Sequence, residues 1–156
     1  MAFANKDVIT AVLSRSTEDV DVTFTSEWNV VNDPSAGVYY PHNGLLKFPL
    51  APGASWRSRY ELTRARQGAF RSKWDVQIKV VGWEDVEVPA GRFRALRIEG
   101  DGSYQRQDVA GNGSGRWVFW YAPQAKRWVK YTYESTDFRG NPNVRQTDEL
   151  VEFRLQ

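Results

Sequence analysis

Few residues of this chain could carry out acid–base or nucleophilic chemistry. His42 is the single histidine, and an imidazole is the natural general base near neutral pH. The chain has no cysteine, which excludes thiol catalysis, disulfide scaffolds, zinc fingers and iron–sulfur clusters. Ser55 lies in a Gly-Ala-Ser-Trp-Arg segment that lacks the second glycine of a nucleophile elbow and precedes a strand instead of a helix.

The carboxylates and the glycine-rich segment give no catalytic pattern either. Glu84 and Glu87 are three residues apart, so they lie on opposite faces of a strand and cannot form a simple glycosidase pair. Glu99 and Asp101 share a face but lack the further oxygen ligands of a calcium loop. Residues 111–115 are not followed by the helix and lysine of a phosphate loop. We therefore expect no catalytic residue, no cofactor and no metal. A hydrolase that uses carboxylates or His42 is the alternative.

Seven tryptophans make aromatic binding the more distinctive chemistry. Residues 117–121 (WVFWY) have apolar side chains on both faces of a strand, so one face needs a covering layer or lines a cleft. Trp120 is adjacent to Phe119 and Trp128 is adjacent to Val129, so each tryptophan is expected on the opposite face of its strand from that neighbour. This arrangement predicts a second apolar surface. The predicted ligand-binding residues are Trp117, Trp120, Trp128, Tyr39, Tyr40 and His42.

These residues favour an apolar small molecule or a protein partner as the ligand. Aromatic planes and an excess of arginine also suit carbohydrate or nucleic-acid stacking, which is a second alternative. The net charge is only +2 and no run of five or six like charges occurs, so nucleic acid is not expected. No segment approaches the roughly 20 apolar residues of a membrane span, and no signal-peptide apolar core begins the chain.

The elements that position these residues are predicted to be strands. Residues 56–62 and 74–80 both alternate between apolar and polar side chains, which is typical of half-buried strands. Gly68 lies between them, so we predict a hairpin. The register that pairs Leu62 with Trp74 places every apolar residue opposite another.

The same alternation predicts strands at residues 20–24, 129–133 and 151–155. A Pro-Ala-Gly turn at residues 89–91 predicts a second hairpin, and the change of apolar parity after Ala95 indicates a β-bulge near Arg94 or Ala95. Residues 101–115 are rich in glycine and polar residues and are expected to form a long exposed connection.

One short segment departs from the strand pattern. Residues 6–14 carry apolar side chains at helical spacing and are the only helix expected. The sequence therefore predicts one all-β domain over residues 1–156. Its architecture is a single curved antiparallel sheet, a half-barrel or barrel, with at most one short helix.

Several motifs occur together in order and resemble an uncharacterised bacterial family of exported or lipoprotein-like β-rich domains. They are Phe48-Pro49-Leu50 through Trp56, Val80-Val81-Gly82-Trp83-Glu84, VEVPAGRF at residues 86–93, Trp120-Tyr121-Ala122-Pro123, and Val129-Lys130. The resemblance implies a curved antiparallel sheet, a location in the periplasm or cell envelope and no established activity, and it supplies no catalytic residues. Lys126-Arg127 stands where this family often has a glycine before the last apolar strand. The architecture is also similar to that of bacterial lipoprotein-carrier half-barrels, which suggests a hydrophobic ligand.

Overall fold

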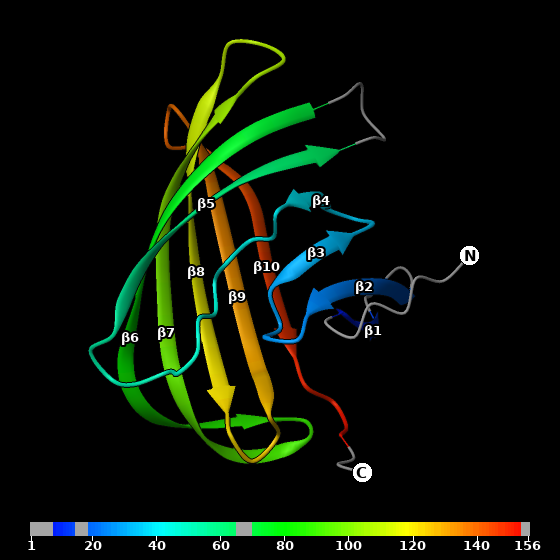
Figure 1. Cartoon of the computed structure of the whole chain (residues 1–156), viewed down its shortest axis with the longest axis vertical. Helices are drawn as coiled ribbons and strands as arrows, with labels where there is room; N and C mark the ends of the chain where they lie inside the picture. Colours follow the sequence, from blue (N-terminus) through cyan, green and yellow to red (C-terminus); the bar gives the residue numbers. More distant parts are fainter. Residues whose placement is uncertain (1–7, 15–18, 65–69, 154–156) are drawn as a thin grey trace.

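A computed structural model describes residues 8–14, 19–64 and 70–153, with side chains from residue 19 onward. Ten strands form one sheet (Figure 1). They are β1 (Val8–Ser14), β2 (Asp19–Thr25), β3 (Val30–Asp33), β4 (Gly37–Tyr40), β5 (Ser55–Arg64), β6 (Phe70–Val88), β7 (Gly91–Arg106), β8 (Asn112–Ala122), β9 (Arg127–Asp137) and β10 (Pro142–Glu149).

Each strand pairs antiparallel with the next one along the chain, so the strand order in the sheet is the sequence order. The long strands β5 to β10 form a curved wall, and the short strands β1 to β4 lie in front of its concave face (Figure 1). The described residues contain no helix. The prediction of an all-β half-barrel built from one antiparallel sheet is thus confirmed.

The helix expected at residues 6–14 is wrong. Val8–Ser14 is strand β1 and pairs with β2 from Val8 opposite Thr25 to Ser14 opposite Asp19. Residues 6 and 7 lie outside the described residues. Four of the seven β1 residues, Val8, Ile9, Thr10 and Val12, are branched at Cβ. Branched residues lose rotamer freedom in a helix and suit a pleated strand.

The hairpin of β5 and β6 is confirmed, but its register differs from the predicted one by two residues. Leu62 is opposite Ser72 and Tyr60 is opposite Trp74. A shift of two residues keeps every side chain on its face, so the alternation of apolar residues is equally consistent with both registers.

The structure has β-bulges at two positions that the sequence did not predict. The pairing of β6 with β7 shifts between Val80 and Gly82, which leaves Val81 as the extra residue, whereas Arg94 and Ala95 pair regularly. The pairing of β8 with β9 shifts between Trp120 and Tyr121, which leaves Val129 as the extra residue. The bulge predicted near Arg94 or Ala95 is therefore wrong. The apolar residues of β7 change parity because Phe93 and Ala95 are buried in one cluster on one face of the sheet, whereas Leu96 and Ile98 are buried in another cluster on the opposite face.

Residues 101–115 are not a long connection, because β7 continues to Arg106 and β8 begins at Asn112. Glycine is needed here for close packing. A Cβ atom on Gly115 would lie 2.8 Å from the Trp117 ring and 2.9 Å from the Trp74 ring. The strand predicted at residues 151–155 is also wrong over its described part, residues 151–153, which follow the last strand as irregular chain.

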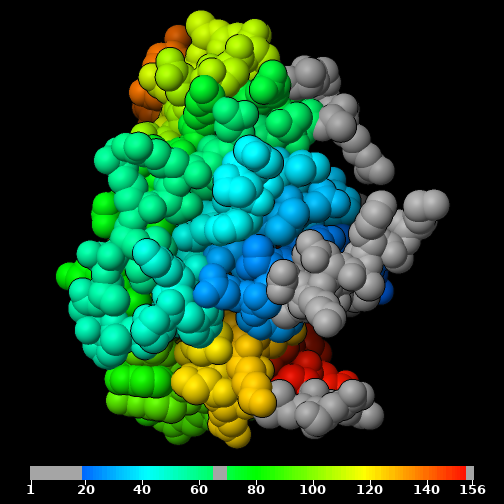
Figure 2. Space-filling model, in the orientation of Figure 1, coloured from blue at the N-terminus to red at the C-terminus, as the bar shows by residue number. Residues whose placement is uncertain are grey.

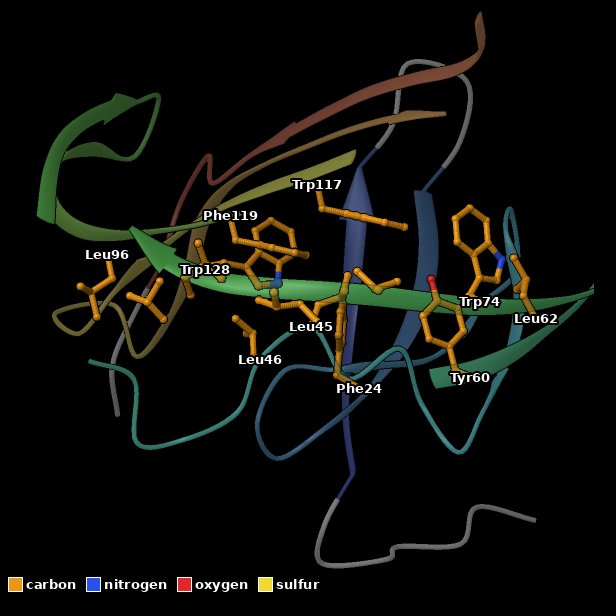
Figure 3. Packing of buried hydrophobic residues seen from close by; sticks show 14 of the residues in the cluster. Phe24, Leu45, Leu46, Tyr60, Leu62, Trp74, Leu96, Trp117, Phe119 and Trp128 are labelled. Atoms are coloured by element: carbon orange, nitrogen blue, oxygen red, sulfur yellow. The ribbon is translucent and has the colours of Figure 1, made fainter. Parts of the chain in front are cut away.

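The buried residues form two clusters on opposite faces of the sheet. The larger one fills the concave side and contains Phe24, Leu45, Trp74, Trp117 and Phe119 among others (Figure 3). The smaller one lies on the other face, where β6 and β8 end and β7 and β9 begin. Its members are Val86, Val88, Phe93, Ala95, Ala122, Ala125, Val129 and Leu150. The one-residue bulge at Val81 moves the even-numbered residues of β6 from the first cluster to the second.

Candidate functional site

The concave side of the half-barrel encloses a cavity of about 220 Å³. Its walls come from both layers of the fold, because residues of β2 and β3 face residues of β5, β6, β8, β9 and β10 across it. Ser35 and Val144 line it at the molecular surface, and both are exposed. The strands β2 to β4 and the segment after them, coloured blue and cyan, cover this side of the molecule in Figure 2.

Aromatic rings form most of the back wall of the cavity. Trp74 lies edge-on to Trp117 with ring centroids 5.3 Å apart, and Trp117 stacks on Tyr133 at 5.0 Å. Phe119 packs on Tyr131 at 4.8 Å. Trp117 is directly opposite Tyr133, and Phe119 is directly opposite Tyr131, so these rings meet as cross-strand pairs of β8 and β9. Trp74 on β6 reaches Trp117 on β8 across β7. The result is a continuous apolar wall on a rigid sheet.

The front of the cavity is fixed by buried polar side chains. Asn29 donates from Nδ2 to the Leu46 carbonyl at 2.8 Å and accepts the Leu46 N–H at 2.7 Å. Asn43 accepts the Val30 N–H through Oδ1 at 2.9 Å, and the Ser58 hydroxyl donates to the Asn43 carbonyl at 2.8 Å. These bonds satisfy backbone groups of Val30, Asn43 and Leu46, and they hold the irregular segment between β4 and β5 across the sheet.

Leu45 and Leu46 belong to this segment between β4 and β5. Both side chains are only 2% exposed and lie against the cavity between Phe24 and the aromatic wall (Figure 3). The segment is irregular, so its leucines have no period-two signal that would assign them to the concave face.

A polar group of side chains lies at one side of the cavity. Arg64, Asp33, Asp148 and the tyrosines contribute to it. Burial raises the pKa of Tyr131 well above its usual value, and the nearby charges of Asp148 and Asp33 add to this effect. Burial also raises the pKa of Tyr60, and it raises the pKa of Tyr133 to about 12. The tyrosine hydroxyls are therefore neutral over the physiological pH range.

The structure brings together three of the six predicted ligand-binding residues. Trp117, Trp128 and Tyr39 all line the cavity. The prediction that Trp128 faces a second apolar surface with Trp120 is wrong, because the bulge at Val129 turns Trp128 to the concave side and leaves Val129 in the smaller cluster.

Tyr40 and His42 lie outside the cavity lining. Tyr40 is 76% exposed and points away from the core. His42 is half-buried in the segment that follows β4, and its Nδ1 atom is buried without a hydrogen-bond partner among the described residues.

Trp120 lies on the opposite face of the sheet from the cavity. Its Nε1 donates to Glu84 Oε2 at 2.9 Å. Arg97 and Lys130, its cross-strand neighbours on β7 and β9, lie 5.6 and 5.8 Å from its ring centroid. Arg97 also pairs with Glu84 and Glu99. The second face of the 117–121 strand is thus covered by charged side chains stacked on an indole, and its carboxylates are engaged in ion pairs.

A broad groove of about 1400 Å³ crosses the convex face of the sheet at the other end of the strands. Tyr40 lies at its β4 side and Phe138, which is 66% exposed, lies at the turn after β9. Polar cross-strand rows lie between them, and Arg59 and Lys73 are paired there with Asp75 and Glu61. The groove is consequently polar, and its two cationic side chains are paired with carboxylates.

Sequence reasoning missed several cavity residues. Arg64 has the parity of Tyr60 and Leu62, so continuing the alternation of residues 56–62 by one step would have placed it on the cavity side. Trp28 follows β2 in a turn and had no pattern to assign it. Asp33 and Asp148 lie on strands that are too short or too polar to show a buried face by sequence alone.

The sequence matches no protein-family model, and a search of curated proteins finds no match. Among solved structures, the fold is similar to the crystal structure of a "putative lipoprotein" from Parabacteroides distasonis ATCC 8503. The TM-score is 0.51 at 12% sequence identity, over 94% of this chain and 87% of that chain. At this identity the similarity concerns the fold. Within the described residues, no helix is long and apolar enough to span a bilayer.

Proposed function

We propose that this protein is a non-catalytic binding module of the bacterial cell envelope that holds a small apolar ligand in the cavity of the half-barrel. The observation that carries the proposal is the cavity itself. It is lined by aromatic rings on a rigid sheet, with a few polar groups at one side. Ligand sites in proteins generally combine an apolar lining with a small number of polar groups that orient the ligand.

The size of the cavity limits the ligand. An engineered apolar cavity of about 150 Å³ binds benzene. A cavity of about 220 Å³ therefore suits a ligand with one aromatic ring or a short acyl chain. A protein partner could insert no more than one side chain, so a small molecule is the better fit.

The geometry supports binding over hydrolysis. The catalytic candidates named from the sequence are Glu84, Glu99 and His42, and all three lie outside the cavity lining. Both glutamates are paired with Arg97. Asp33 and Asp148 do line the cavity, where they accept hydrogen bonds from the Ser35 N–H and from Gln146 Nε2. A general base must come within hydrogen-bond reach of the bound substrate, and the three candidates named from the sequence do not face the cavity.

The proposed location in the periplasm or cell envelope has two supports. One is the motif resemblance to exported or lipoprotein-like domains. The other is the similarity of the half-barrel fold to the "putative lipoprotein" from Parabacteroides distasonis. Fractionation of the host cell tests it directly. We expect the protein in the periplasmic or membrane fraction, and recovery with cytoplasmic markers would contradict the proposal.

Binding can be tested with 2-phenylethanol, a neutral probe with one aromatic ring. Titration calorimetry gives the affinity, and the indole N–H signals of Trp117 and Trp128 report whether the probe enters the cavity. Val22 lines the cavity and is fully buried, so Val22→Phe should place a ring in the space and weaken binding at least fivefold.

Val38→Phe is the matched control, because Val38 is 51% exposed and lies outside the cavity lining. It should bind the probe like the wild type. If 2-phenylethanol leaves both indole signals unchanged at saturating concentration, the cavity is not a ligand site and the proposal fails.

The convex groove supports a second candidate function, the binding of a neutral glycan. Sugar rings stack on exposed aromatic side chains and exchange hydrogen bonds with amide and hydroxyl groups. Tyr40 and Phe138 at its ends and Ser103, Gln105 and Asn112 between them offer these groups. Affinity electrophoresis in gels with and without soluble glycan tests it. A retardation lost in Tyr40→Ala and kept in Trp83→Ala, which changes an exposed aromatic residue outside the groove, would favour this function.

A further inference from the structure

Arg64 is the side chain of the cavity whose bonding is incomplete. It is the last residue of β5 and shares the concave face with Tyr60 and Leu62. Its Nε atom is buried and has no hydrogen-bond partner among the described residues. Leaving a buried donor unsatisfied costs free energy, so such a group in a native fold requires an explanation.

The position of Arg64 is fixed by packing on both sides. Its guanidinium carbon lies 5.3 Å from the centroid of the Phe70 ring. Its Cγ atom packs so close to Gly37 that a Cβ atom there would approach it to 3.1 Å. The stem and the guanidinium are thus held at the cavity, and no carboxylate of the residues that the structure describes forms an ion pair with Arg64.

The other charged groups of the cavity are already engaged. Asp33 accepts the backbone N–H of Ser35 at 2.8 Å, and Asp148 accepts from Gln146 Nε2 at 2.8 Å. Both carboxylates also interact with further groups. The donor capacity that remains at this side of the cavity belongs to a guanidinium, whose planar fork matches a carboxylate.

We infer that the ligand of the cavity is a small acid, with its apolar body against the aromatic wall and its carboxylate on Arg64. This inference rests on the proposed function and adds the ligand's chemical class. The geometry assigns the two ends of the ligand separately. Trp117, Phe119 and Trp128 contact the body, and the terminal N–H groups of the Arg64 guanidinium donate to the carboxylate.

The test compares phenylacetate with 2-phenylethanol, which has a similar apolar body and no charge. Because a hydrogen bond to a charged group is worth about 1.5–3 kcal/mol, wild-type protein should bind phenylacetate about tenfold more tightly. The Arg64 Nε–Hε signal should shift with phenylacetate and remain unchanged with 2-phenylethanol. Acetate, which has the carboxylate alone, should shift this signal much less at equal concentration.

Two variants assign the preference to Arg64. Arg64→Met keeps a long stem and removes the charge and the donors, so it should lose the tenfold preference and keep its affinity for 2-phenylethanol within about twofold. Arg139→Met is the matched control, because Arg139 lies 5.1 Å from the centroid of the Phe138 ring and outside the cavity lining. It should retain the wild-type preference. Equal thermal unfolding of the two variants shows that Arg64→Met is folded.

The outcomes separate this inference from the proposed function. Equal binding of both probes by the wild type, or an unchanged preference in Arg64→Met, overturns the assignment of an acid and leaves an apolar cavity. An Arg64 signal that responds to acetate as strongly as to phenylacetate also overturns it. If neither probe binds, the proposed function itself fails. Should Arg64→Met not fold, the wild-type Nε–Hε response to the three probes decides alone.

Discussion

Trp28 donates a hydrogen bond of 3.0 Å from Nε1 to the carbonyl oxygen of Lys126, 98 residues along the chain. Both residues have left-handed backbone conformations, with φ of 62° and 54°, and they are the only residues other than glycine with positive φ in the described part of the chain. Arg127 lies 4.4 Å from the Trp28 ring centroid. The front layer of the half-barrel is thereby fastened to the turn between β8 and β9.

Replacing Lys126 with glycine should stabilise the protein by up to about 1 kcal/mol. A left-handed conformation costs a residue with a side chain about 1–2 kcal/mol, and glycine avoids this cost but loses about 0.5–1 kcal/mol of backbone entropy on folding. Urea unfolding measures the difference. Lys126→Ala, which keeps a Cβ atom, should give no gain, and a glycine variant less stable than the wild type would contradict the strain assigned to this turn.

Asn29→Ala should destabilise the protein by about 2–6 kcal/mol. Asn29 is 1% exposed and makes hydrogen bonds to both backbone groups of Leu46. Its loss leaves a buried N–H and a buried carbonyl without partners, at about 1–3 kcal/mol each. Amide hydrogen exchange at Leu46 should also become faster. Asn112→Ala at an exposed position is the control and should change the free energy of unfolding by less than about 0.5 kcal/mol.

The pair of residues 59 and 75 provides a test of the β5–β6 register. Arg59 is directly opposite Asp75, and the alternative register would place it opposite Gln77. Directly opposite Cα atoms of antiparallel strands lie about 4.5–5.5 Å apart, within disulfide range, whereas diagonal ones are about 7–8 Å apart. The chain has no cysteine of its own. We expect Arg59→Cys with Asp75→Cys to form a disulfide on mild oxidation; faster bridging of Arg59→Cys with Gln77→Cys would refute this register.

Stability should fall at alkaline pH because of the buried tyrosines. Their pKa values are higher in the folded state than in the unfolded chain, where tyrosine titrates near 10, and that of Tyr133 is about 12. The folded state therefore binds more protons above pH 10, and the free energy of unfolding decreases from about pH 10 until the folded pKa is passed.

Tyr133→Phe should make this decrease shallower by up to about 1.4 kcal/mol per pH unit between pH 10 and 12. Urea unfolding at a series of pH values measures the slope. Phe119→Leu is the control, since it changes packing and no ionisable group, and it should lower stability by a similar amount at every pH. A slope in Tyr133→Phe equal to that of the wild type would show that this hydroxyl is not desolvated.

The sequence by itself determined which residues face the core in the regular strands. The side chains of a strand alternate with period two, so Tyr60, Leu62, Trp74, Val76 and Ile78 were assigned to the buried face from spacing alone, and all five are buried. The Pro-Ala-Gly turn likewise determined the β6–β7 hairpin, because turn chemistry is local.

Only the tertiary structure decided the register, the bulges and the cavity. A two-residue shift preserves the alternation, so only the complete pairing of β5 with β6 distinguishes the two registers. A bulge depends on the partner strand, and the one at Val129 reversed the side assigned to Trp128. The cavity forms where β2 and β3 close over β8 to β10. Such contacts join residues about 100 positions apart, which local periodicity cannot encode.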